Sequence, residues 1–128
     1  MSITKILAIF LLVVVINSAL TYDKVILQDR TALCLDGSPG AYYIHAGDPK
    51  KVMFFMEGGA WCGDVSTSAT LENCYKRSKT ALGSSTSYPA HVSWSSGALS
   101  DDGDNYFNGW TRIFMKYCDG SGHQGSRS

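Results

Sequence analysis

A pair of glycines follows an apolar run in the stretch KKVMFFMEGGAWCGD. Glycine at the carboxyl end of a strand lets the chain turn through conformations closed to other residues and leaves backbone N–H groups open to a ligand. In open α/β sheets, ligands bind beyond the carboxyl ends of the strands. Two N–H groups aimed at one point would stabilise a developing negative oxygen by about 3 kcal/mol per donor. Gly58 and Gly59 therefore predict either an oxyanion hole or a tight turn from strand to helix.

The segments on either side of the glycines must position them. VMFFM, residues 52–56, is apolar at every position and predicts a central strand covered on both faces, because a strand with one wet face would alternate. Residues 66–80 predict a helix that begins at Ser66 or Thr67, where a hydroxyl group can cap it. The residues at three- and four-residue spacing on one side of this helix are Leu71, Cys74, Tyr75 and Ser78.

A second apolar strand follows after a long polar stretch. Residues 82–110 are rich in Ser, Gly, Asp and Asn and predict a long surface excursion. Residues 113–117 are mostly apolar and predict a strand that ends in Cys, Asp and Gly. Strand, glycine loop, helix, long loop and strand make a βαβ unit, which predicts parallel neighbours, a right-handed crossover and an α/β fold.

Upstream of the glycines, short apolar segments predict further extended structure. KVILQD and ALCLD predict a strand and a bend, and DGSPG predicts a tight reversal. Residues 41–45 have the aromatic and β-branched content of a strand. The segment AGDPKK would join this strand to residues 52–56 as an antiparallel pair.

Residues 1–20 have the composition of a secretory signal peptide. One lysine precedes an apolar run from Ile6 to Ile16, and small polar residues follow it. The run is about half of the roughly 20 residues that a membrane-spanning helix needs. We therefore expect cleavage between Ala19 and Thr21 and a soluble, extracellular product with no membrane span.

Export would place the four cysteines in an oxidising compartment, where disulfides are the default. Four cysteines allow three pairings. Cys62 and Cys74 flank a short loop-and-helix segment and are the first expected pair, whereas Cys34 and Cys118 would pair with each other or with cysteines outside this sequence. A zinc site is disfavoured because no Cys-x-x-Cys spacing occurs.

Charge and composition exclude several other classes of partner. Eleven basic residues balance eleven acidic ones without forming a block, so no nucleic-acid partner is expected. DDGDN, residues 101–105, lacks the alternate spacing and the terminal Glu of a calcium loop and predicts a solvated turn. No metal ion or cofactor is expected.

Several motifs occur in an order that carries a family resemblance. They are CLDGSPGAYYI, MEGGAWC, the later Cys74, LGSS, SGALS and FNGWTRIFMKYCDGSGHQG. In this order the sequence resembles the amino-terminal part of the pectin acetylesterase family, which includes the Notum carboxylesterases. The resemblance extends from Cys34 to Gly125.

The resemblance implies an α/β-hydrolase fold with a mostly parallel sheet and flanking helices, and a secreted enzyme with disulfides. It also implies a Ser-His-Asp triad that cleaves carboxylic esters without a metal or cofactor. Family substrates include acetyl groups on pectin and a lipid acyl group on a signalling protein. The oxyanion donors fall on the backbone N–H groups of Gly59 and Ala60, within a loop that also contains Glu57, Gly58 and Trp61.

The sequence departs from the family pattern at the triad. The family nucleophile occupies a Gly-x-Ser-x-Gly elbow well downstream of the YCDG strand, and this sequence has no such elbow. Ser121 belongs to the loop after YCDG and is not expected to be the nucleophile. His45, His91 and His123 match no catalytic histidine of the family.

These observations predict a secreted carboxylic-ester hydrolase of the pectin acetylesterase type, with an acylated polysaccharide or a related ester as its substrate. Residues 21–128 would be the amino-terminal portion of its domain, truncated before the nucleophile elbow and inactive alone. A lipase or peptidase of the same fold is an alternative.

An alternative from another class is a secreted module without catalysis, or a pseudoenzyme, that binds a glycan or a protein. Its evidence would be the loop aromatics, which are Trp61, Trp94, Tyr106, Phe107 and Trp110. Packing of such residues against the sheet is the commoner role, and only Trp61 is expected near a substrate.

Overall fold

The computed structural model describes residues 20–124, and these form one sheet of five strands with a single helix. The elements are β1 (Thr21–Ile26), β2 (Ala41–His45), β3 (Asp48–Met56), α1 (Thr67–Arg77), β4 (His91–Ser93) and β5 (Trp110–Met115). Apart from Leu20, the expected signal peptide lies outside the described residues. Within residues 20–124, no helix has the length and apolar character needed to cross a bilayer.

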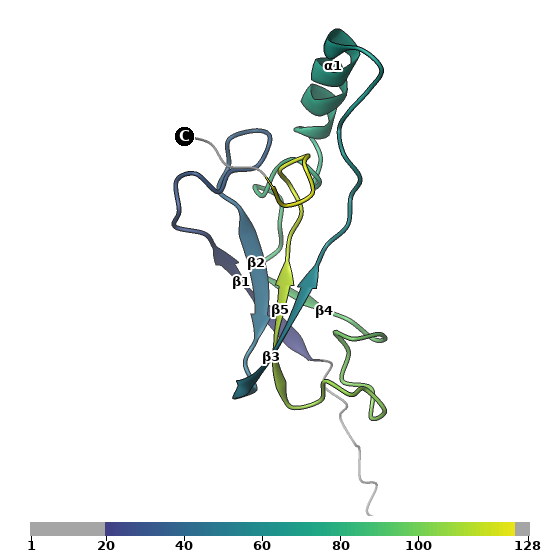
Figure 1. Ribbon diagram of the computed structural model, residues 1–128. Helices are drawn as coiled ribbons and strands as arrows, with labels where there is room; N and C mark the ends of the chain where they lie inside the picture. The colour runs from purple at the N-terminus through teal and green to yellow at the C-terminus, as the bar shows by residue number, and fades with distance from the viewer. Residues whose placement is uncertain (1–19, 125–128) are drawn as a thin grey trace, which may run out of the picture.

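The strand order is β3-β5-β2-β1-β4, so β5 lies between β2 and β3 (Figure 1). The expected antiparallel pair of residues 41–45 with 52–56 is therefore wrong, because these strands are not neighbours. The expected mostly parallel sheet is also wrong for the described residues, because only β3 and β5 pair in parallel and the other three ladders are antiparallel. The sheet is mixed.

The turn between β2 and β3 explains how β5 enters this position. The backbone N–H of Asp48 donates to the carbonyl of Gly109, and that of Gly47 donates to the Thr111 hydroxyl. A side chain on Gly47 would lie 2.5 Å from the carbonyl oxygens of Gly109 and Trp110. The start of β5 is thus packed directly against this turn, which leaves no space for β2 and β3 to pair.

The parallel pairing of the predicted βαβ unit is confirmed, because β3 and β5 are neighbours and the connection between them contains α1 and also β4. The Ser66 hydroxyl accepts a hydrogen bond from the Ala69 N–H at 3.2 Å and caps the helix. None of the helix residues is buried, and the side chains of Leu71 and Tyr75 are 67% and 65% exposed. The helix stands beyond the end of the sheet (Figure 1), so the expected apolar stripe does not cover it.

The core lies on one face of the sheet. Tyr22, Tyr43 and Phe114 point into it from three strands, and Tyr88 and Leu99 cover them. The expected surface excursion over residues 82–110 thus contributes buried residues, and it also contains β4, which pairs with β1. Arg112 is 1% exposed beneath the same segment, and its guanidinium donates to the carbonyls of Ser100 and Phe107 and to the Asn108 side-chain oxygen.

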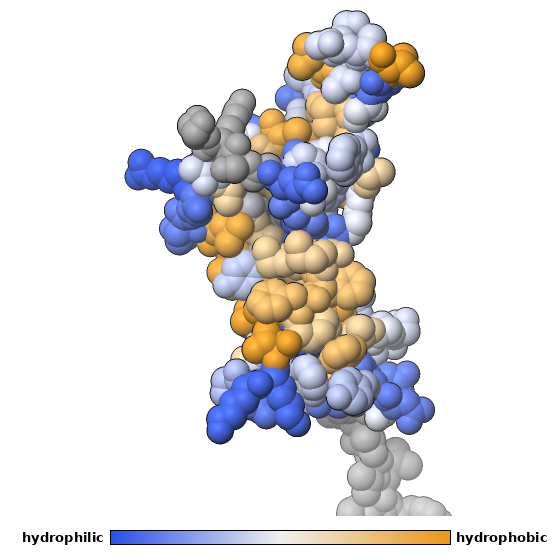
Figure 2. All heavy atoms as spheres, viewed as in Figure 1, coloured by the Kyte–Doolittle hydropathy of each residue, from blue (hydrophilic) through white to orange (hydrophobic). Residues whose placement is uncertain are grey.

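β3 forms one edge of the described sheet, and the expectation of a central strand covered on both faces is wrong here. Pairing with β5 satisfies only one side of its backbone. Phe54 and Met56 point to one face and Phe55 to the other, and all three are exposed. Figure 2 shows apolar side chains gathered across the middle of the sheet. An uninterrupted apolar pattern thus indicates that both faces of a strand are apolar, but it does not indicate that another strand pairs with each of its edges.

An exposed apolar edge strand is a template for self-association. We expect Phe54→Lys, which places a charge where the side chain is 64% exposed, to raise the monomer fraction measured by analytical ultracentrifugation. Val65→Lys is the matched control, because Val65 is 100% exposed but lies outside the sheet. Equal effects of the two substitutions would contradict a specific role of the β3 edge.

Candidate functional site

The glycine loop leaves the carboxyl end of β3 and is anchored to β5 by Glu57. The Glu57 N–H donates to the carbonyl of Met115 at 3.0 Å. Its carboxylate accepts from Lys116 Nζ at 2.5 Å and from the Tyr117 N–H at 2.8 Å. Both partners of this ion pair are largely buried, with 13% of the Lys116 side chain and 22% of the Glu57 side chain exposed. The first residue of the loop is therefore fixed to the neighbouring strand end.

Tyr117 defines the path of the next two residues. A side chain on Gly59 would lie 2.2 Å from the Tyr117 ring, so only glycine fits there without a shift. The Tyr117 hydroxyl donates to the carbonyl of Ala60 at 2.7 Å. Ala60 has a φ of 55°, in the left-handed region that few non-glycine residues occupy.

Arg77, from the last turn of α1, holds the loop from another side. Its guanidinium donates to the carbonyl of Gly59 at 2.7 Å and also to the carbonyl of Ala60. Within residues 20–124, the N–H groups of Gly59 and Ala60 donate to no other protein atom. Successive N–H groups near a left-handed residue commonly form anion-binding concavities. The loop thus has its carbonyls occupied and two of its N–H groups available.

Two disulfides fasten the segments around this loop. Cys62 pairs with Cys74, which confirms the first expected pair, and Cys34 pairs with Cys118. The Cys62 N–H also donates to the carbonyl of Gly120 at 3.2 Å. The first disulfide ties the loop to α1, and the second ties the segment before β2 to the residues after β5.

Residues 119–123 pack against the loop and contain a serine, a histidine and an aspartate. The Ser121 hydroxyl donates to the Asp119 carboxylate at 2.7 Å. His123 Nε2 lies 2.9 Å from the Glu57 carbonyl, to which it donates since a carbonyl can only accept. These contacts do not place the His123 ring between Ser121 and Asp119, so the three groups lack the arrangement of a triad.

The other histidines lie outside this region. His45 Nδ1 contacts the Thr21 carbonyl at 2.9 Å, and His91 Nδ1 contacts the Asp23 carboxylate at 2.8 Å. Both contacts are exposed. Within the described part of the chain, no three His, Cys, Asp or Glu side chains come together as a metal site.

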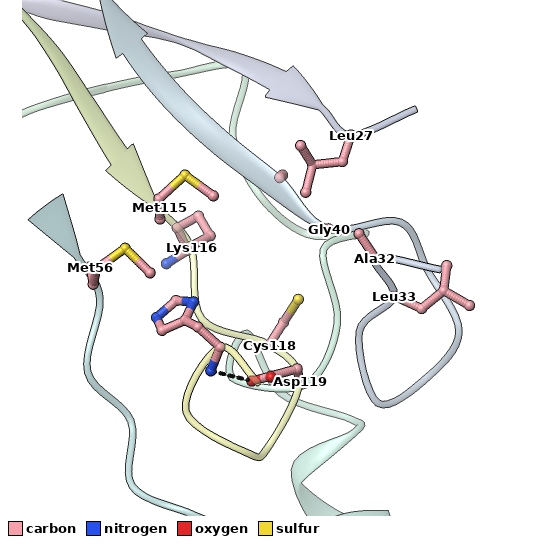
Figure 3. A pocket seen from close by; sticks show the side chains of 11 residues that line it. Leu27, Ala32, Leu33, Gly40, Met56, Met115, Lys116, Cys118 and Asp119 are labelled. Carbon is pink, nitrogen blue, oxygen red and sulfur yellow. Dashed lines mark hydrogen bonds between the residues drawn. The ribbon is translucent and has the colours of Figure 1, made fainter. Parts of the chain in front are cut away.

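Two hollows flank the loop, one on each face of the sheet. The first, of about 200 Å³, is lined mainly by apolar side chains, with Lys116, Asp119 and His123 as its charged or polar members. Figure 3 shows Met56, Met115 and Lys116 on one side of it and Leu27 and Leu33 on the other. The second is lined by Phe55, Gly58, Trp94 and Phe114, among others. Glu57 and Gly58, the first residues of the loop, line the second hollow, and His123, which contacts the Glu57 carbonyl, lines the first.

Burial raises the pKa of the Tyr88 hydroxyl well above its ordinary value, and the nearby Glu57 carboxylate adds to the effect. The pKa of Tyr43 is raised for the same two reasons. Both hydroxyls donate to backbone carbonyls, Tyr88 to Ala81 and Tyr43 to Pro89, each at 2.7 Å. These tyrosines therefore act as hydrogen-bond donors that support the site and not as acids or bases near neutral pH.

The structure adds three supporting residues that the sequence did not indicate, namely Arg77, Lys116 and Tyr117. Of these three residues, only Lys116 could have been recognised from the sequence, because it is a single charge within the apolar pattern of residues 113–117. Trp61 is exposed, and its indole Nε1 lies 3.0 Å from the position that a Gly122 side chain would take. The ring therefore lies over Gly122 beside the loop.

Comparison with known proteins places these residues in a family. The family model described as Pectinacetylesterase matches residues 16–128. Among curated proteins of Arabidopsis thaliana, the chain is 34% identical to Pectin acetylesterase 5 over 103 residues, which are 77% of this chain and 22% of that protein. It is 36% identical to Pectin acetylesterase 4 over 104 residues and 36% identical to Pectin acetylesterase 11 over 101 residues. In both cases the match covers 75% of this chain and 24% of the relative. The chain thus spans about a quarter of the length of these relatives.

The two glycines of the loop give a matched pair of substitutions. We expect Gly59→Ala to lower the free energy of unfolding by about 1–3 kcal/mol, because its new methyl group would overlap the Tyr117 ring. Gly58→Ala should change it by less than about 0.5 kcal/mol, because that methyl group would meet nothing within 4 Å. Urea unfolding followed by fluorescence measures both. Equal losses would contradict the close approach of Tyr117 to Gly59.

Proposed function

The chain belongs to the pectinacetylesterase family, and on that basis we propose that it carries the oxyanion-binding loop of a secreted carboxylic-ester hydrolase. The observation that carries this proposal is the state of the loop, whose carbonyls at Gly59 and Ala60 are bound while the two N–H groups have no protein partner in residues 20–124. When a nucleophile attacks an ester, negative charge develops on the carbonyl oxygen. Fixed N–H donors stabilise that charge more than they stabilise the neutral ester.

The surrounding fold supports an α/β-hydrolase arrangement for the complete domain. The loop follows the carboxyl end of β3, beside the parallel strand β5, which is where ligands bind in open α/β sheets. Glu57 and Arg77 hold the loop on both sides, so its donors would need little reorganisation during the reaction.

The substrate we propose is an O-acetyl ester on a polysaccharide, because the matched relatives are named pectin acetylesterases. The reaction consumes water and yields acetate and a free sugar hydroxyl. The Ser-His-Asp triad would come from segments that follow the described residues in longer family members. Secretion is supported by the two disulfides, which persist in oxidising compartments.

The isolated chain should not hydrolyse esters, because no group in residues 20–124 has the arrangement of an activated nucleophile. With p-nitrophenyl acetate, we expect its rate to equal that of a Gly59→Asp variant. A rate well above that variant would contradict the proposed division of roles.

A chimera tests the loop in an active context. In the chimera, residues 34–124 would replace the aligned segment of Arabidopsis Pectin acetylesterase 5. In a variant of this chimera, lactic acid would replace Ala60, so that an ester oxygen stands where the backbone N–H of residue 60 was. We expect kcat on acetylated pectin to fall by about 10²–10³-fold, the usual effect of losing one oxyanion donor.

Glycolic acid at Gly63, outside the proposed donors, is the control for the backbone substitution and should leave kcat close to that of the parent chimera. An inactive parent chimera, or equal kcat values for the Ala60 and Gly63 variants, would contradict the proposal.

A further inference from the structure

A second feature of the surface lies at the opposite end of the sheet, in the loop over residues 101–109 that precedes β5. The Tyr106 side chain is 78% exposed, unlike the tyrosines of the core. Its ring lies 5.5 Å from the Phe107 ring and 5.6 Å from the Trp110 ring, centroid to centroid. These contacts support one part of the ring and leave most of it open to solvent.

Buried and polar groups hold this loop in one conformation. The Asn105 side-chain amide donates to the carbonyls of Gly97, Ala98 and Ser100 at 2.7–3.1 Å. Asn105 Oδ1 also accepts from the N–H of Phe107 at 3.0 Å.

The Asn108 amide bonds the Asp102 carbonyl, and the buried Arg112 in turn holds Asn108 Oδ1 at 2.9 Å and the Phe107 carbonyl at 2.9 Å. The exposed ring is therefore presented by a framework that is already ordered. Such preorganisation lowers the entropic cost of binding a ligand.

A shallow hollow beside the ring is lined by Asp102, Asp104, Tyr106 and Phe107, together with the backbone around Gly97. The two carboxylates are exposed, and each can accept hydrogen bonds from hydroxyl groups. Arg112, the basic residue that holds this loop, is buried and engaged with protein oxygens. The hollow thus combines an exposed aromatic face, hydroxyl acceptors and negative charge.

We propose that this hollow is a binding site for a neutral pyranose unit of a polysaccharide, which stacks on Tyr106 and donates hydroxyl hydrogen bonds to Asp102 and Asp104. The C–H face of a pyranose matches the aromatic ring, and its equatorial hydroxyl groups match the carboxylates. An ionised uronate is disfavoured, because its carboxylate would meet two like charges. An esterified uronate carries no such charge and fits the site.

The site is separate from the proposed oxyanion loop. β5 begins directly after residues 101–109 and ends beside Glu57, so the two regions lie at opposite ends of this strand (Figure 1). Six strand residues span about 20 Å. A polysaccharide chain could therefore be held at one end of the sheet independently of chemistry at the other. The binding proposal does not depend on the esterase proposal, because it is tested by affinity alone.

The test compares two oligosaccharides that differ in charge, a fully methyl-esterified oligogalacturonate and the same oligomer without esters. By calorimetric titration of the whole chain, we expect the neutral oligomer to bind with a millimolar Kd and the ionised one at least tenfold more weakly. Tyr106→Ala should weaken binding of the neutral oligomer at least tenfold. Tyr75→Ala is the matched control, because Tyr75 is 65% exposed on α1, and it should leave binding unchanged.

A charge variant separates sugar recognition from general adhesion to an aromatic surface. Asp104→Asn removes one negative charge and should narrow the difference in affinity between the two oligomers. Circular dichroism would confirm that each variant is folded. Absence of binding to the neutral oligomer, equal loss in Tyr75→Ala and Tyr106→Ala, or unchanged discrimination in Asp104→Asn would overturn the proposal.

Discussion

The parallel pairing of β3 with β5 is the constraint on which the rest of the site depends. It brings the two strand ends to the same edge of the sheet, so Glu57 after β3 meets Lys116 and Tyr117 after β5. Tyr117 can then donate to the Ala60 carbonyl and occupy the space beside Gly59. If β3 were paired with β2, as the short turn between them suggested, none of these contacts could form. The loop conformation is thus a consequence of strand order.

The disulfides fix parts of the chain that the core cannot hold. α1 buries none of its residues, yet it supplies Arg77, whose position matters for two loop carbonyls. The Cys62–Cys74 bond joins this helix to the loop, so Arg77 is held near its partners without burial of an apolar face. The Cys34–Cys118 bond does the same for the segment that precedes β2. Covalent links here take the place of packing.

The local features were predictable from the sequence, and the long-range ones were not. The Ser66 cap, the α1 segment and the Cys62–Cys74 pair each depend on short spacings or on patterns within one element. The parallel pairing of β3 with β5 is the long-range exception, and it was predicted from the order of elements along the chain. The edge position of β3 was missed because hydrophobic periodicity reports which faces are apolar and not which strands are adjacent. Arg77 and Tyr117 were missed because they lie 17 and 57 residues along the chain from Ala60, the residue to which both donate. No local pattern encodes such contacts.

The two ends of the sheet differ in the charged groups that they present to a ligand. At the end with the glycine loop, the Lys116 ammonium is neutralised by Glu57, and the Arg77 guanidinium is turned toward carbonyl oxygens. An anion formed there would be stabilised mainly by the dipoles of fixed N–H groups and not by a full positive charge. Such dipoles favour a transient oxyanion in the transition state without strongly binding anions in the ground state, which is the condition for raising a rate. At the other end, the exposed carboxylates of Asp102 and Asp104 line the hollow beside Tyr106, so a permanent anion is disfavoured in that hollow and a neutral polyhydroxyl ligand is not.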